Sequence, residues 1–198
     1  MINKTLDFYN NNSKTYIEKT LSGDTSNLYK GFLNNIPKGG SILDLGCGSG
    51  RDSIEFIKQG YNVTAVDGSK ELAVAARKII GQQVICSKFE DIKLNKTFHG
   101  IWACASLLHV NKNDIVDVIK NVSLNLKPNG VFYMSFKYAE NEYIDEKGRY
   151  FNCYTEKTFS ELITKIKDLK VRKIYKTTDV IPGRGDITWL NILCIKVN

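Results

Sequence analysis

The chain alternates between short runs rich in β-branched and aromatic residues and longer runs whose apolar residues recur every three or four positions. From residue 41 onward, the short runs that favour strands are 42–45, 61–66, 83–86, 100–104 and 131–136. The runs with helical periodicity between them are 51–59, 70–79 and 115–126. Because strands and helices take turns, the pattern predicts a parallel sheet with helices on both faces.

The last part of the chain breaks this rhythm. After a loop over 138–152, apolar residues at 159, 162, 163 and 166 predict one more helix. Residues 171–178 and 187–197 then both favour strands, and the segment between them is too short for a crossover helix. Strands joined in this way must be antiparallel, so we expect a hairpin to close the sheet.

The first forty residues favour two helices, over 4–20 and 24–35, which we expect to pack across the top of the sheet. No low-complexity tract or Pro-rich linker divides the chain. The predicted organisation is therefore one α/β domain over 1–198, with a helical lid over 1–40 and a core over 41–198.

Composition narrows the class of protein. The chain has 198 residues, of which 42% are hydrophobic and 25% charged, as in a globular domain. The N-terminus is polar and no apolar stretch approaches the length of a bilayer helix, so we expect a cytoplasmic protein without a membrane partner. The five cysteines lie far apart without a Cys-x-x-Cys pair, which argues against a disulfide framework and a metal site. The formal net charge of +7 is dispersed along the chain, which disfavours a nucleic-acid partner.

The candidate chemistry begins at a glycine-rich turn, where Gly46, Gly48 and Gly50 follow the first predicted strand. Open α/β sheets bind ligands at this point, and glycines let the backbone approach a ligand closely. Asp67 ends the second predicted strand, where it can accept hydrogen bonds from both hydroxyl groups of a ribose. Together these residues predict a ligand that contains adenosine.

The spacing of the glycines separates the possible ligands. A dinucleotide fingerprint needs its third glycine at position 51, where this chain has Arg51, and no Gly-Lys-Ser/Thr sequence of a phosphate-binding P-loop occurs. Asp44, two residues before the first glycine, suits a cationic group such as the ammonium of an amino acid better than a pyrophosphate. A nicotinamide oxidoreductase therefore remains only a distant alternative.

These residues resemble the class I S-adenosylmethionine-dependent methyltransferases. The matching features are the Asp44–Gly50 loop, Asp67, the Trp102–His109 segment and the Leu126–Gly130 turn, so that the resemblance covers about 40–198. It implies a Rossmann-like seven-stranded sheet of order 3-2-1-4-5-7-6 with strand 7 antiparallel. It also implies S-adenosylmethionine as cofactor and S-adenosylhomocysteine as product. The chain is most similar to small bacterial methyltransferases of the tellurite-resistance and thiol-methylating type, which carry a helical N-terminal lid.

The resemblance implies a set of cofactor-binding residues on the loops after the strands: Asp44, Gly46, Cys47, Gly48, Gly50, Asp67, Gly68, Ser69, Phe89, Glu90, Ala103 and Cys104. Many relatives have an acid where this chain has Lys88, which leaves recognition of the adenine amino group to Glu90 or to the backbone. Tyr9 and Tyr16 share one helix face and either close over the cofactor, with a cation–π contact to its sulfonium, or pack on the core.

Candidate residues for the methyl acceptor follow the later strands: Lys137, Tyr138, Arg149, Phe151, Arg184 and Trp189. His109 is the candidate catalytic residue, with a helix-start or core role as the alternative. For the arginines the alternative is solvated loop charge, and for Trp189 it is core packing. Convergence of Lys137, Arg149 and Arg184 would favour an anionic acceptor.

The predicted function is in-line methyl transfer to a small-molecule acceptor such as a thiol, a chalcogen oxyanion or another small nucleophile, by a monomer or homodimer. The Asp/Asn-Pro-Pro-aromatic motif of DNA amino-methyltransferases and the Pro-Cys nucleophile of cytosine-5 enzymes are both missing from the sequence. Methylation of RNA or protein, supported by the positive charge, and a cofactor-binding sensor that has lost catalysis remain the alternatives.

Overall fold

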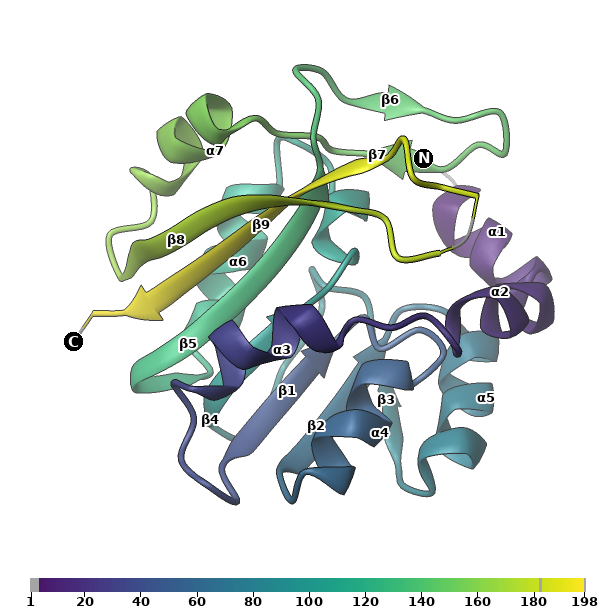
Figure 1. Ribbon diagram of the computed structural model, residues 1–198, viewed down its shortest axis with the longest axis horizontal. Coiled ribbons are helices and arrows are strands. Elements are labelled where there is room, and N and C mark those ends of the chain that lie inside the picture. Colours follow the sequence, from purple (N-terminus) through teal and green to yellow (C-terminus); the bar gives the residue numbers. More distant parts are fainter. Residues whose placement is uncertain (1–3, 182, 198) are drawn as a thin grey trace.

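The computed structural model describes residues 4–181 and 183–197, so the first three residues of the polar N-terminus lie outside it. Its centre is a seven-stranded sheet of order β3-β2-β1-β4-β5-β9-β8 (Figure 1). The strands are β1 (Ser41–Leu45), β2 (Asn62–Asp67), β3 (Val84–Cys86), β4 (Phe98–Ala103), β5 (Leu126–Lys137), β8 (Leu169–Thr178) and β9 (Thr188–Lys196). The first five are parallel, and β9 is antiparallel to both β5 and β8. Because β6 (Tyr143–Ile144) and β7 (Tyr150–Phe151) form a separate small sheet, β8 and β9 are the sixth and seventh strands of the main sheet, and the predicted fold class and strand order 3-2-1-4-5-7-6 are confirmed.

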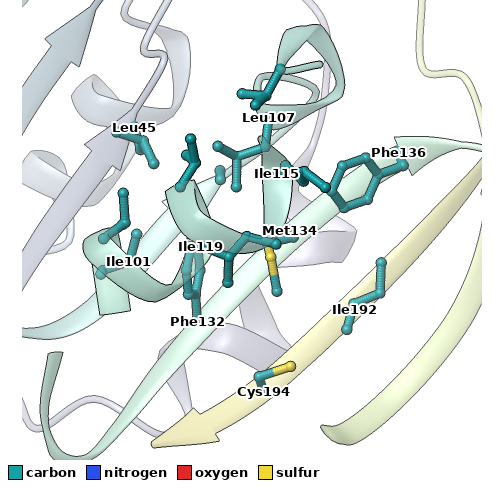
Figure 2. Packing of buried hydrophobic residues seen from close by; sticks show 14 of the residues in the cluster. Leu45, Ile101, Leu107, Ile115, Ile119, Phe132, Met134, Phe136, Ile192 and Cys194 are labelled. Carbon is teal, nitrogen blue, oxygen red and sulfur yellow. The ribbon is translucent and has the colours of Figure 1, made fainter. Parts of the chain in front are cut away.

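Helices cover both faces of the sheet. The helices on one face are α3 (Ser26–Leu33), α4 (Arg51–Lys58) and α5 (Lys70–Ile80), and those on the other are α6 (Ile115–Ser123) and α7 (Glu156–Ile163). Successive strand residues alternate between these two layers. Ile42 and Trp102 pack with α3 and α4, whereas Leu45 and Ile101 pack with Ile119 of α6 on the opposite face (Figure 2). Burial on both faces explains why these strands read as apolar runs.

The N-terminal region differs in detail from the expectation. The predicted helix over 4–20 is two helices, α1 (Lys4–Asn11) and α2 (Ser13–Thr20), separated at Asn12. Both lie near the carboxyl ends of the parallel strands, beside α5 (Figure 1). Helix α3 instead lies along one face of the sheet, where Phe32 is fully buried against Trp102. The two parts of the first forty residues therefore have different surroundings.

Two further segments differ from the pattern-based expectation. Helix α6 ends at Ser123, and Leu126 belongs to β5, where it pairs with Phe98 of β4. The loop over 138–152 contains a short hairpin of β6 (Tyr143–Ile144) and β7 (Tyr150–Phe151), and a turn of 3₁₀-helix, η1 (Leu107–His109), follows β4. Across the residues described, every helix is too short or too polar to cross a membrane.

Candidate functional site

The glycine-rich turn joins β1 to α4 and has a backbone that other residues would strain. Gly46, Gly48 and Gly50 have φ values of 81°, 54° and 80°. A Cβ atom at Gly46 would lie 2.4 Å from the Cβ of Ser106, and one at Gly50 would lie 2.7 Å from Cγ1 of Ile80. These positions require glycine both for conformation and for space. The turn is therefore a side-chain-free cradle at the carboxyl end of the sheet.

Asp67 lies directly beneath this turn, at the end of β2. Its two carboxylate oxygens accept hydrogen bonds from the backbone N–H groups of Gly48 and Ser69, each at 2.8 Å. Burial raises the pKa of Asp67 to about 6, although the two N–H donors act in the opposite direction. Ser69 in turn caps α5 and donates from Oγ to Asn10 of α1 at 2.8 Å. The carboxylate is therefore fixed between the turn, α5 and α1.

A cavity of about 70 Å³ lies between the glycine turn and α1. The predicted residues that line it are Tyr9, Tyr16, Gly46, Gly48, Asp67, Gly68, Phe89, Glu90 and His109. The residues that sequence reasoning did not select are Thr5, Leu6, Leu72, Lys88, Ala105 and Ser106. Of these, Lys88 stands in the segment that the resemblance marked, whereas the φ of 51° at Ala105 has no signal in the sequence. Ala105 lies just beyond the end of β4, where such strained backbone often marks functional sites.

A second cavity of about 630 Å³ adjoins the first and shares Tyr9, Tyr16, Gly46, Ala105 and His109 with it. The other predicted residues in its wall are Cys47, Cys104, Lys137, Arg149, Phe151, Arg184 and Trp189. The structure thus brings together five of the six predicted acceptor residues, from β5, the 138–152 loop and the β8–β9 hairpin. The predicted residues that line neither cavity are Asp44, Gly50, Ser69, Ala103 and Tyr138.

The boundary between the two cavities is a row of aromatic side chains from α1, α2 and η1. His109 Nδ1 lies 2.7 Å from the carbonyl oxygen of Tyr150, which can only accept, so this nitrogen carries the proton. His109 Nε2 then accepts from the Tyr9 hydroxyl group at 2.8 Å. Burial lowers the pKa of His109 to about 4, so its ring is neutral at pH 7. The Tyr9 ring also meets Tyr16 edge-on, with 5.2 Å between the ring centroids.

Two buried carboxylates at the start of α4 and in β1 have contrasting surroundings. Asp52 accepts from Arg51, Thr25, Tyr29 and Trp102 at 2.7 to 3.0 Å. Burial would raise its pKa, but Arg51 and the other donors hold it below the usual range. Asp44 accepts from Ser53 Oγ at 2.6 Å, and burial together with the Asp52 charge raises its pKa to about 8. A cationic group placed beside Asp44 would therefore favour its ionised form.

Comparison with known proteins gives matches to methyltransferases over the central part of the chain. Residues 42–130 match the family model described as a methyltransferase domain. YqeM of Bacillus subtilis (strain 168), a protein named as a methyltransferase, is 36% identical over 117 residues, which are 54% of this chain and 47% of the relative. A ubiquinone biosynthesis O-methyltransferase of Rickettsia canadensis (strain McKiel) is 33% identical over 99 residues, which are 48% of this chain and 41% of the relative. The chain spans about half the length of these curated relatives.

The fold comparison covers nearly the whole chain. A crystal structure of the Burkholderia thailandensis 1,6-didemethyltoxoflavin-N1-methyltransferase, with 1,6-didemethyltoxoflavin and S-adenosylhomocysteine bound, superposes with a TM-score of 0.76 at 20% identity. The match covers 98% of this chain and 85% of that one. The strand order, the glycine cradle and the family match agree: residues 42–130 match a methyltransferase domain, and the chain has the Rossmann-like fold of the S-adenosylmethionine-dependent methyltransferases, with S-adenosylmethionine as the cofactor.

Proposed function

We propose that this protein transfers the methyl group of S-adenosylmethionine to a small-molecule acceptor by in-line displacement. The observation that carries the proposal is the contact between the two cavities. The small one lies on the glycine cradle, the large one has a mixed polar and aromatic wall, and they meet at Tyr9, Ala105 and His109. A donor on the cradle, with its amino-acid end in the large cavity at Arg51, would face an acceptor in the rest of the large cavity across this boundary.

The residues present fit the cofactor. The cradle at Gly46 and Gly48 leaves room for its thioether chain, and Asp67 is placed to accept from the ribose hydroxyl groups. Asp44 lines neither cavity, but an ammonium group next to the turn would counteract the burial that raises the pKa of Asp44, and Arg51 in the wall of the large cavity suits the carboxylate. When bound, S-adenosylmethionine supplies an electrophilic methyl group and a neutral leaving group.

The contribution of the chain is then alignment and exclusion of water. Tyr9 and Tyr16 lie over the cradle, where their rings would hold a sulfonium and keep solvent away. Holding donor and acceptor in line contributes roughly 7 kcal/mol or more to lowering the barrier. Because His109 is neutral and its Nε2 already accepts from Tyr9, we assign it the role of positioning Tyr9 rather than that of a general base. An acceptor that arrives ionised, such as a thiolate, needs no base.

The organisation and partners of the protein follow from the same proposal. In the single domain that we propose, α1 and α2 are the part of the N-terminal helical lid that covers the cofactor, whereas α3 packs on the sheet. The relatives named for ubiquinone biosynthesis and for 1,6-didemethyltoxoflavin support a small organic acceptor rather than a macromolecule. The more specific likeness to tellurite-resistance and thiol-methylating enzymes, and the monomeric or homodimeric state, stay predictions.

An acceptor screen that measures release of S-adenosylhomocysteine tests this function. Thiols, phenols, amines and chalcogen oxyanions are offered with S-adenosylmethionine, and we expect turnover with at least one small molecule. A rise in melting temperature with S-adenosylmethionine but not with NAD(P)H is expected beforehand, because a ligand that binds only the native state stabilises it. Tight cofactor binding without turnover would instead indicate a sensor, and methylation of RNA with steep salt dependence would indicate an RNA substrate.

A further inference from the structure

One wall of the large cavity is the face of the sheet formed by β5 and β9. Ser135 and Lys137 of β5 both line this wall. Their register partners on β9, Asn191 and Trp189, line it beside them. Because residues two apart on a strand share a face, these four side chains form a continuous polar and aromatic wall. Lys137 is the only one of the four that carries a charge.

Lys137 is a half-buried ammonium group in the wall of the large cavity. Its Nζ lies 3.8 Å from the centre of the Phe151 ring and donates to the Tyr143 hydroxyl group. Over the ranges 4–181 and 183–197, no carboxylate lies within ion-pair distance of Lys137. Burial lowers the pKa of Lys137, and the neighbouring charges of Arg149 and Arg184 act in the same direction, against the smaller opposing effect of Cys153 and of Asp145, which is paired with Arg149. An anion placed here would relieve all three effects.

Other charged groups of this cavity are already paired or hydrogen-bonded. Arg149 makes an ion pair with Asp145 at 2.7 Å, and Arg51 makes one with Asp52 at 2.7 Å. Of the acids in the wall besides Asp52, Asp179 accepts from Trp189 Nε1 at 3.1 Å and from the Ile181 N–H at 2.8 Å.

The remaining acid, Asp24, is exposed and accepts from the Ser26 N–H at 2.9 Å. The positive charges without a carboxylate partner among the described residues are therefore Lys137 and the exposed Arg184.

We propose that the methyl acceptor is an organic anion whose negative group binds Lys137, with Arg184 contributing at the mouth of the cavity. The inference rests on the proposed function and narrows its range of acceptors. A cavity of about 630 Å³ falls in the range of about 300 to 1,000 Å³ that is typical of sites for organic ligands. A carboxylate on an organic body supplies the missing counter-charge and can also contact the aromatic rings of Phe151 and Trp189 in the same wall, which a bare oxyanion cannot use.

Matched probes that differ only in charge test the inference. The protein loaded with S-adenosylhomocysteine is titrated calorimetrically with 3-sulfanylpropanoate and 3-sulfanylpropanamide, and with 4-hydroxybenzoate and 4-hydroxybenzamide. We expect each acid to bind at least about tenfold more tightly than its amide, the size of one charge-assisted hydrogen bond in a partly desolvated site. Lys137→Met should remove this preference, and Lys137→Arg should keep most of it.

Lys173→Met is the matched control, because Lys173 also lies over an aromatic ring, 4.8 Å from the centre of Tyr175, but outside both cavities. The control should keep the preference for acids. The inference is overturned if, in both pairs, the acid binds no more tightly than its amide or neither binds detectably. It is also overturned if the Lys137→Met variant keeps the preference for acids. The same titrations are also made without S-adenosylhomocysteine, so that acid binding is measured independently of the cofactor. An unmodified protein that does not bind S-adenosylmethionine would overturn the proposed function and not the anion site.

Discussion

The two cavities at the carboxyl end of the sheet are built in different ways. The cofactor cavity depends on backbone: three glycines in a left-handed conformation, and N–H groups that hold Asp67. The acceptor cavity depends on side chains, which come from β5, the 138–152 loop and the β8–β9 hairpin. The cofactor cavity is therefore suited to one ligand held in a fixed place. A few substitutions of side chains in the wall of the acceptor cavity would change which methyl acceptor binds there.

This difference predicts where substitutions have large effects. A change in the cradle removes space that nothing else in the fold can supply, because its neighbours are buried backbone and packed side chains. A change in the acceptor wall alters one contribution among several. The following predictions test this contrast, in order of decreasing effect.

Gly48→Val should abolish cofactor binding, with the dissociation constant for S-adenosylmethionine raised at least about a hundredfold. A Cβ atom at Gly48 would lie 3.2 Å from the Tyr16 ring, and the φ of 54° disfavours a β-branched residue. Isothermal titration calorimetry measures the affinity. Gly60→Val is the control, because Gly60 also has a positive φ, 86°, but has nothing within 4 Å of its added Cβ. Similar losses of affinity in both variants would mean that general strain, not the cradle, is responsible.

Asp67→Ala should raise the same dissociation constant at least about tenfold, equivalent to about 1.4 kcal/mol, because the ribose hydroxyl groups lose their acceptor. The unmodified protein should also lose affinity as the pH falls through about 6, where Asp67 becomes protonated and stops accepting. The variant should lack this pH dependence. Asp117→Ala, at an exposed position of α6, is the control. An unchanged affinity in Asp67→Ala would remove this residue from the cofactor site.

Tyr9→Phe should lower kcat about three- to tenfold, because it keeps the ring but leaves His109 Nε2 without its donor, and one hydrogen bond contributes about 0.5 to 1.5 kcal/mol. Steady-state release of S-adenosylhomocysteine measures the effect. Tyr61→Phe, outside both cavities, should have no effect on kcat. If Tyr9→Phe behaves like Tyr61→Phe, the hydrogen bond from Tyr9 to His109 does not contribute to turnover.

Arg184→Gln should have the smallest effect, raising the KM for an anionic acceptor about two- to threefold, because exposed charges contribute at most about 1 kcal/mol. The effect should fade at high salt, where such interactions are screened. Arg172→Gln, exposed on β8 and outside the cavity, is the control. A tenfold or larger change would show that Arg184 is drawn into the cavity when the acceptor binds.

The succession of strands and helices and the glycine cradle could be predicted from the residues because both are local, whereas the strand order was predicted from the resemblance to a known family. The periodicity of apolar residues predicts most strands and helices one by one. The glycines and Asp67 lie at the ends of adjacent strands of the sheet. The prediction was wrong in detail where a segment has no such signal. Leu126 continues an apolar helical pattern but pairs as a strand, and Asn12 interrupts a helix without Pro or Gly. The hairpin of β6 and β7 consists of only two residues on each side.

The sequence alone determined the alternating α/β pattern and the turn for a ligand that contains adenosine, since these depend on residue type at positions close in the chain, and its resemblance to a known family added the class I architecture and the cofactor. Only the tertiary structure decided that Tyr9 donates to His109, that Ala105 has a left-handed backbone and that Lys137 has no carboxylate partner within the part of the chain that is described. Each of these facts depends on which segments distant in the chain meet at the carboxyl end of the sheet. Charge balance and tautomers in a cavity are set by such neighbours, and no local pattern encodes them.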